Sequence, residues 1–143
     1  MRLVKTKNIQ LFKRDTGEQY FFENSGVNYL QFKPLHPRFK IYEKEQLDGL
    51  KDDFIKFWNE ATCDLEDYDM VLIDEAGPGI VWDVIPVESI LNIIEKKSEK
   101  TELIFTGRKF PQEIVEKADY VSEIEKRKHP FDRGILAREG VEY

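Results

Sequence analysis

The chain has 143 residues and a formal net charge of -6, and 41% of its residues are hydrophobic and 35% are charged. This length predicts a single domain over residues 1–143, and the hydrophobic fraction excludes a disordered chain. Because the acidic excess is mild and the lysines and arginines are scattered, the charge argues against nucleic acid or an anionic membrane as the main partner.

A single cysteine, Cys63, and the absence of a long apolar run indicate the compartment. One cysteine forms no internal disulfide, which suits a reducing environment. No apolar run approaches the roughly 18 residues of a membrane-spanning helix, and the polar residues 5–7 follow the start too closely for a leader peptide. We therefore expect a cytoplasmic protein with no membrane partner.

The first third of the chain predicts two strands separated by a short helix. Apolar and polar residues alternate at 8–13, which indicates a strand, and Asp15-Thr16-Gly17 is a turn signal. A short helix is expected at 21–26, where it closes with glycine, and a second strand at 27–32. Two prolines then predict a loop over residues 33–37.

A helix is predicted from residue 44 to residue 60, where apolar residues recur at steps of three and four. Phe54, Phe57 and Trp58 lie on the apolar face of this helix. Their spacing makes a core position the first interpretation of these aromatic side chains, before any role in ligand binding.

Residues 68–75, Tyr-Asp-Met-Val-Leu-Ile-Asp-Glu, predict a buried central strand with an acidic end. Asp74 and Glu75 fall at the carboxyl end of this strand, the edge where open α/β sheets bind ligands. Hard cations take oxygen ligands, so such a pair is typical of Mg²⁺ sites in nucleotide-binding proteins. A strand that simply ends in a helix cap or a solvated turn is the alternative, and this pattern leaves both open.

The remaining elements predict a mostly parallel α/β sheet flanked by helices. Pro86 begins a predicted helix at 86–94, and a strand follows at 101–106. A short helix at 111–117 and a further strand at 119–124 complete the alternation. Strands and helices at these spacings are typical of right-handed crossovers between parallel strands.

Five stretches resemble, in order and spacing, the P-loop type of ATP:corrinoid adenosyltransferase. They are residues 68–75, Trp82-Asp83 with Pro86, Thr106-Gly107-Arg108, Ala118-Asp119, and 129–137 with 140–143. The resemblance implies a P-loop-NTPase-like, Rossmann-like three-layer fold, usually dimeric. It also implies transfer of the 5′-deoxyadenosyl group of ATP to the cobalt of a reduced corrinoid, in cobalamin metabolism.

The resemblance also implies roles for individual positions. Asp74 and Glu75 would lie beside Mg²⁺ and the triphosphate, with Glu75 as the catalytic residue. The other implied positions bind the nucleotide or, for the two aromatic residues, the corrinoid; they are Thr106, Gly107, Arg108, His129, Asp132, Phe39 and Tyr42. Two alternatives stay open: Arg108 in a plain strand-to-helix turn, and His129 in a hydrogen bond across the C-terminal turn.

The chain departs from the family at the phosphate-binding loop. The family begins with a strand, a Gly-rich loop ending in Gly-Lys-Thr, and a helix whose N-terminus receives the phosphates. Before residue 68 the glycines are Gly17, Gly26 and Gly49, and none precedes Lys-Ser or Lys-Thr. We therefore expect a shortened member without the phosphate-loop strand and helix, and whether it catalyses the reaction alone stays open.

Two hypotheses follow from this departure. In the first, the chain is an adenosyltransferase-like subunit with weak or partner-dependent binding of ATP and Mg²⁺, completed by a P-loop-bearing partner. In the second, it is a non-catalytic binding or regulatory protein that keeps the fold, an interpretation favoured by residues 76–79, Ala-Gly-Pro-Gly. Without the loop strand, the central strands either pair directly or accept a strand of another chain, and we expect a homodimer or a heteromer.

Overall fold

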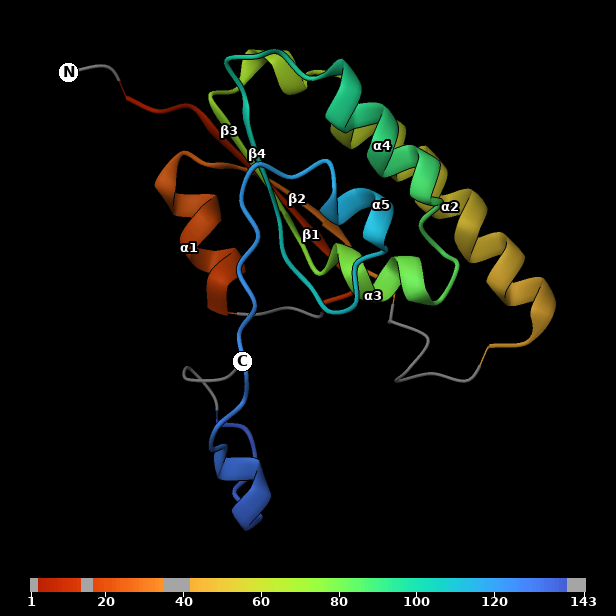
Figure 1. Cartoon of the computed structure of the whole chain (residues 1–143), viewed down its shortest axis with the longest axis vertical. Coiled ribbons are helices and arrows are strands. Elements are labelled where there is room, and N and C mark those ends of the chain that lie inside the picture. Colours follow the sequence, from red (N-terminus) through yellow and green to blue (C-terminus); the bar gives the residue numbers. More distant parts are fainter. Residues whose placement is uncertain (1–2, 14–16, 35–41, 139–143) are drawn as a thin grey trace.

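Within residues 3–13, 17–34 and 42–138, which it describes, the computed structural model contains a four-stranded parallel sheet (Figure 1). The strands are β1 (Thr6–Leu11), β2 (Asn28–Phe32), β3 (Met70–Asp74) and β4 (Glu102–Phe105). Their spatial order is β2-β1-β3-β4. The predicted parallel α/β sheet is thus confirmed, and β3 pairs directly with β4 in this chain, with Leu72 beside Ile104.

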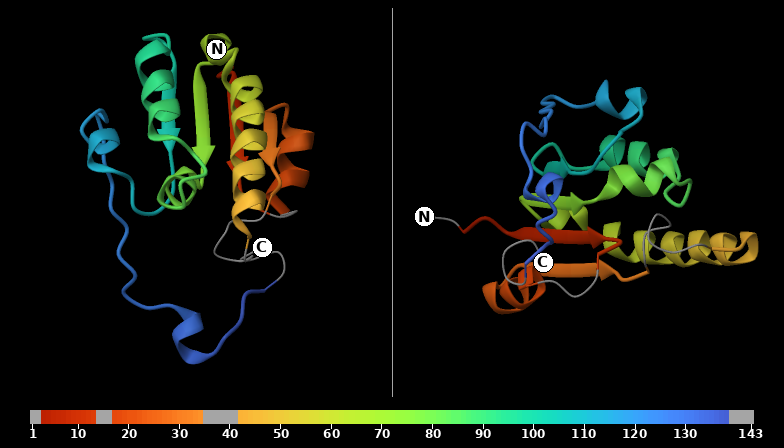
Figure 2. Two further views of the ribbon diagram at one scale, coloured as in Figure 1. Left: turned by 90° about the vertical axis from the view of Figure 1, so that its right-hand side faces the viewer. Right: turned by 90° about the horizontal axis from the view of Figure 1, so that it is seen from below.

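Helices cover both faces of the sheet, which gives three layers. They are α1 (Gly17–Ser25), α2 (Lys44–Thr62), α3 (Ala76–Val81), α4 (Val87–Lys96) and α5 (Gln112–Val115), with 3-10 turns at Leu65–Asp67 and Pro130–Arg133. Figure 2 shows α1 on one face and α2 with α4 on the other. This arrangement follows from right-handed crossovers, because the chain passes from β1 to β2 in one direction and from β2 to β3 in the opposite one.

The predicted helix over residues 44–60 is confirmed as α2. It begins at a capping box, in which the side chains of Glu43 and Gln46 bond reciprocally to backbone groups of the first turn. Its buried face includes Phe54 and Trp58, which belong to the same core cluster as the apolar residues of β1 and β3, and the Phe54 ring meets that of Phe32 in β2. None of the helices in the described residues is long and apolar enough to cross a membrane.

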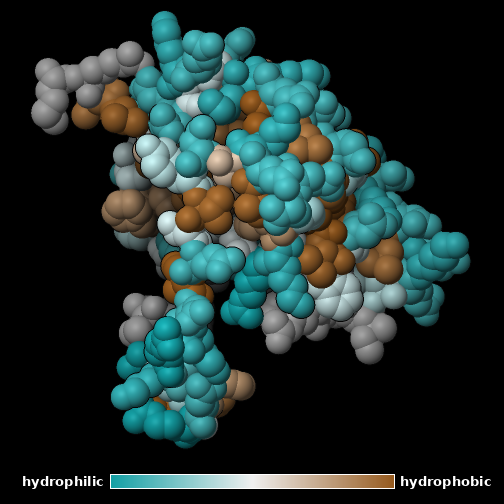
Figure 3. All heavy atoms as spheres, in the orientation of Figure 1, coloured by the Kyte–Doolittle hydropathy of each residue, from teal (hydrophilic) through white to brown (hydrophobic). Residues whose placement is uncertain are grey.

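The segment after α5 corrects the sequence prediction. Residues 119–124 were expected to form a strand, yet they form none, and Tyr120 and Ile124 are 93% and 97% exposed. The segment runs away from the sheet (Figure 1), and the surface at its far end is mainly hydrophilic in Figure 3. Among the described residues β4 is therefore an edge strand. The sequence of residues 119–124 favours an extended conformation, but a strand forms only where a neighbouring strand is available for hydrogen bonding.

Candidate functional site

Three neighbouring strands end at one edge of the sheet, and the backbone turns sharply at each end. Phe12 follows β1 with a φ of 57°, Glu75 follows β3 with a φ of 64°, and Gly107 lies two residues beyond β4 with a φ of 138°. Left-handed backbone is uncommon for residues other than glycine and tends to occur at functional sites. This edge is also where open parallel sheets bind ligands. The backbone therefore singles out the carboxyl ends of β1, β3 and β4 as the candidate site.

Asp74 is the centre of the polar contacts at this edge. The Thr106 hydroxyl donates a hydrogen bond to Asp74 Oδ1 over 2.5 Å, and the Lys13 ammonium lies 2.6 Å from Asp74 Oδ2. The backbone N–H of Glu75 donates to Thr106 Oγ1 over 3.2 Å. The structure thus brings together Asp74, Glu75 and Thr106, as the sequence implied, and adds Lys13, which sequence reasoning missed. The signal for Lys13 was its place as the last residue of the first predicted strand.

The charges at this edge hold each other in their ionised forms. Burial by itself would raise the pKa of Asp74, but the hydrogen bonds from Lys13 and Thr106 and the charge of Lys13 outweigh it, so this pKa lies below its ordinary value. Burial would lower the pKa of Lys13, yet the hydrogen bond to Asp74 and the nearby carboxylates of Asp74, Glu18 and Glu75 raise it. The pair is therefore ionised from mildly acidic to alkaline pH.

Replacing Asp74 by Asn is expected to lower the free energy of unfolding by about 1 to 2 kcal/mol at neutral pH, a value reduced because solvent partly screens the pair. The folded pKa of Asp74 lies below the unfolded one, so its contribution is present above about pH 4 and is lost as the pH falls through the folded pKa. Urea unfolding of both proteins across this range measures the difference. Asp52→Asn, on the exposed side of α2, is the control, and a difference that stays constant below pH 4 would contradict the assignment.

The glycines after β3 have a structural role in this site. A Cβ atom on Gly77 would lie 2.3 Å from the backbone oxygen of Arg108, and one on Gly107 would lie 2.7 Å from the backbone nitrogen of Gly77. The turn after β4 thus lies directly against the start of α3. The Arg108 side chain is exposed and, in the described part of the chain, makes no ion pair or hydrogen bond. Close packing therefore explains why residue 77 is a glycine. On sequence alone, residues 76–79 favoured a non-catalytic protein.

Two of the other implied positions, His129 and Asp132, do not lie at this edge. His129 Nδ1 accepts a hydrogen bond from the backbone N–H of Phe131 over 3.1 Å, and Asp132 accepts one from Lys126 over 2.7 Å. Both belong to the turn at Pro130–Arg133, which lies well below the sheet in Figure 1. Their role in closing the nucleotide pocket stays a prediction. Tyr42 is half-buried before α2, where burial raises its pKa, and Phe39 lies outside the described residues.

The carboxylates suit a magnesium ion that arrives together with phosphate. Both oxygens of Asp74 already have partners, whereas the Glu75 carboxylate has no hydrogen-bond or ion-pair partner among the described residues. The same residues contain no cluster of three or more His, Cys, Asp or Glu side chains that could hold a metal. Mg²⁺ commonly binds through one or two carboxylates plus substrate phosphates. Glu75, supported by Asp74, fits that mode and does not form a self-contained metal site.

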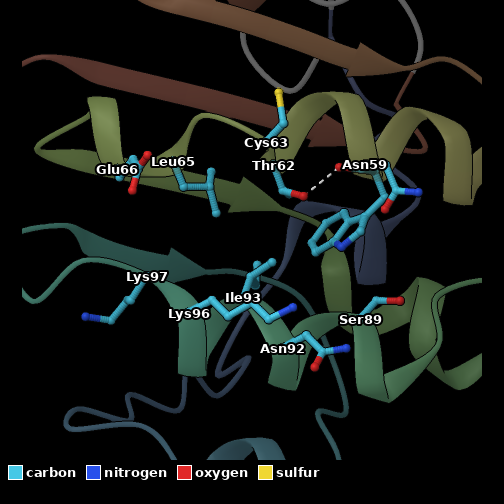
Figure 4. A pocket seen from close by; sticks show the side chains of 11 residues that line it. Asn59, Thr62, Cys63, Leu65, Glu66, Ser89, Asn92, Ile93, Lys96 and Lys97 are labelled. Carbon is cyan, nitrogen blue, oxygen red and sulfur yellow. Dashed lines mark hydrogen bonds between the residues drawn. The ribbon is translucent and has the colours of Figure 1, made fainter.

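A separate groove of about 440 Å³ lies between the facing sides of α2 and α4 (Figure 4). Leu65 and Ile93 contribute apolar walls, and Asn59, Asn92 and Lys96 contribute polar groups. The groove includes the C-terminal ends of both helices, so it opens toward the amino ends of the strands. None of the implied site residues lines it, and it is distinct from the site around Asp74.

Comparison with known proteins shows which family this chain is related to. The family model described as ATP:corrinoid adenosyltransferase BtuR/CobO/CobP matches residues 3–143. A corrinoid adenosyltransferase of Escherichia coli (strain K12) is 36% identical over 129 residues, which cover 89% of this chain and 64% of that protein. One from Sinorhizobium sp is 34% identical over 133 residues, covering 90% of this chain and 61% of that protein. The chain thus spans 61–64% of the length of these two curated relatives.

Proposed function

The chain belongs to the ATP:corrinoid adenosyltransferase family, and from this premise we propose that it is an adenosyltransferase-like protein of cobalamin metabolism. We propose that ATP and Mg²⁺ bind at the carboxyl edge of β3. The observation that carries this proposal is the convergence of Asp74, Glu75, Thr106 and Lys13 at the ends of three neighbouring strands. Carboxylates for a cation and an ammonium for phosphate are the groups that a nucleotide site at this edge requires.

In the proposed reaction, the cobalt of a reduced corrinoid substrate attacks the 5′ carbon of ATP. A cobalt–carbon bond forms, the bond between that carbon and the 5′ oxygen breaks, and triphosphate leaves with the bonding electrons. The cobalt is itself the nucleophile, so the protein contributes mainly by binding and orienting the two substrates. Glu75 would hold Mg²⁺ against the phosphates, and Thr106 would fix the turn that carries Glu75 through its hydrogen bonds to Asp74 and to the Glu75 backbone.

We also propose that nucleotide binding by these 143 residues is weak or depends on a partner. They contain no glycine followed by Lys-Ser or Lys-Thr, the part of the family site that surrounds the phosphates. Each charge-assisted hydrogen bond of such a loop is worth roughly 1.5 to 3 kcal/mol, so two of them change the affinity by about a hundredfold or more. A heteromer with a P-loop-bearing chain in the cytoplasm would supply the missing contacts, and a homodimer is the other assembly that we propose.

A non-catalytic binding or regulatory role is the second candidate. The observation that favours it is that both oxygens of Asp74 are already engaged, by Thr106 and by Lys13. A carboxylate in this state has less capacity to bind a cation directly, which is compatible with a fold that is kept while ATP chemistry is lost.

Titration calorimetry tests the proposed nucleotide site. We expect MgATP to bind with a dissociation constant in the high micromolar range or weaker, and Glu75→Gln to weaken binding by about tenfold, because the cation loses its free carboxylate. Glu99→Gln, which removes an exposed carboxylate before β4, is the control and should leave binding unchanged. A low-micromolar dissociation constant that survives Asp74→Ala and Glu75→Ala together would place the nucleotide elsewhere.

An adenosylation assay separates the two candidate functions. With a chemically reduced corrinoid and MgATP, the chain alone is expected to show no detectable turnover, because ATP is not positioned against cobalt. Turnover that appears only with a P-loop-bearing protein would support the subunit interpretation. An ordinary enzymatic rate from the chain alone, lost in Glu75→Ala, would overturn the non-catalytic candidate.

A further inference from the structure

Lys13 is the cationic side chain in contact with Asp74 at the candidate site, and the proposed function does not say how it affects binding of the cation. Its ammonium lies 2.6 Å from Asp74 Oδ2 and 3.6 Å from Glu18 Oε2. The Lys13 side chain is 29% exposed and the Asp74 side chain 19%, so the pair is largely covered while one side remains open to solvent. An ammonium in this position can reach an anion that approaches the edge of the sheet.

The backbone holds Lys13 in this position. The preceding residue, Phe12, is buried, and its ring meets that of Phe32 edge-on at a centroid distance of 5.5 Å. The backbone N–H of Phe12 donates to the Phe32 carbonyl, while its φ of 57° turns the chain out of β1. Since a left-handed residue other than glycine carries strain, the packed ring is what keeps this turn in place. Lys13 is therefore positioned by the core and does not reach Asp74 by chance.

An ion pair of similar geometry elsewhere in the chain shows what distinguishes this one. Lys51 pairs with Asp83 at 2.5 Å, and its side chain is 34% exposed, close to the value for Lys13. Asp83, however, is 85% exposed, whereas Asp74 is mostly buried at the end of the central strand. The Lys51 pair is a surface contact of the kind that contributes little. It offers a matched lysine for comparison.

The balance of charges around Lys13 indicates that its ammonium competes with a divalent cation for Asp74. The positive charge of Lys13 faces three negative charges, on Asp74, Glu18 and Glu75, which leaves these four side chains with a net charge of -2. One divalent cation would neutralise that charge, and it would compete with the Lys13 ammonium for Asp74. A triphosphate that arrives with the cation then offers the ammonium new oxygen acceptors.

We propose that Lys13 is a resident counter-ion of the site. In the nucleotide-free protein its ammonium occupies the place of a divalent cation on Asp74, and it contacts phosphate oxygens when cation and nucleotide bind together. The inference rests on the proposed function for the identity of the ligand. It goes beyond that function by assigning opposite effects to one side chain, a lower affinity for the cation alone and a higher affinity for the cation with phosphate.

The first test measures the affinity of the full chain for Mn²⁺ without nucleotide. Electron paramagnetic resonance detects the Mn²⁺ binding. Lys13→Gln, which keeps a polar side chain without the charge, should bind Mn²⁺ about tenfold more tightly than the wild type. Lys13→Arg keeps the positive charge and should resemble the wild type, as should Lys51→Ala. An unchanged or lower Mn²⁺ affinity in Lys13→Gln, with circular dichroism showing an intact fold, would overturn the proposal.

The second test uses inorganic tripolyphosphate in the presence of Mg²⁺, measured by calorimetry. Lys13→Gln should bind it about tenfold more weakly, opposite in sign to the Mn²⁺ result. A merely structural lysine would weaken both ligands in parallel, which would refute the counter-ion role, and unchanged tripolyphosphate binding would refute the phosphate contact. If MgATP binds with a low-micromolar dissociation constant that survives Asp74→Ala and Glu75→Ala together, while Lys13→Gln gains Mn²⁺ affinity, the proposed nucleotide site fails and the counter-ion assignment holds.

Discussion

Replacing Gly77 by Ala is expected to lower the free energy of unfolding by about 3 kcal/mol. The added Cβ would lie 2.3 Å from the Arg108 oxygen and 2.8 Å from its nitrogen. Both atoms belong to the backbone, so no side-chain rotation relieves the clash, and overpacking of this kind costs about 1 to 3 kcal/mol or more. Because the turn after β4 carries Thr106, the same change should displace the hydroxyl that bonds to Asp74.

Gly49→Ala is the matched control for this substitution. Gly49 lies within α2, and a Cβ built on it meets nothing within 4 Å. Alanine is favoured over glycine in a helix interior by about 0.5 to 1 kcal/mol, so this variant should be slightly more stable than the wild type. Urea unfolding of the two variants measures the predicted loss of stability in Gly77→Ala and the predicted gain in Gly49→Ala. Equal stability of Gly77→Ala and the wild type would show that the two turns are not in close contact.

Phe54→Ala is expected to destabilise the protein by about 3 to 5 kcal/mol, the usual cost of emptying a buried aromatic position. Phe54 is fully buried, and its ring lies 5.4 Å from that of Phe32 and 5.5 Å from that of Trp58, measured between centroids. It therefore joins α2 to the edge of the sheet at β2. Thermal and urea unfolding measure the loss.

Phe21→Ala serves as the control for that change, since Phe21 is 64% exposed on α1. Its removal should alter the free energy of unfolding by no more than about 0.5 kcal/mol. If Phe54→Ala had a comparably small effect, the aromatic residues of α2 would not form the core contact described above.

Periodicity along the chain was sufficient to predict the main elements of the fold. The steps of three and four between residues 44 and 60 predicted α2 and its buried aromatic face, and the apolar run before Asp74 predicted β3. Both patterns are local, because they report which side of one element avoids water. The meeting of Asp74 with Thr106 also followed from the sequence, since parallel strands present their carboxyl ends at one edge.

The tertiary structure alone decided features that depend on contacts between distant segments. Lys13 is separated from Asp74 by the whole of α2, and only the neighbouring places of β1 and β3 in the sheet bring their charges together. Gly77 is glycine because the backbone of Arg108 approaches it, a contact that composition does not reveal. Residues 119–124 have the composition of a strand but form none, since a strand requires a partner as well as a propensity. Sequence by itself thus determined which segments prefer burial and which carry charge, whereas the fold decided which of them meet, because pairing and close approach are properties of two segments and not of one.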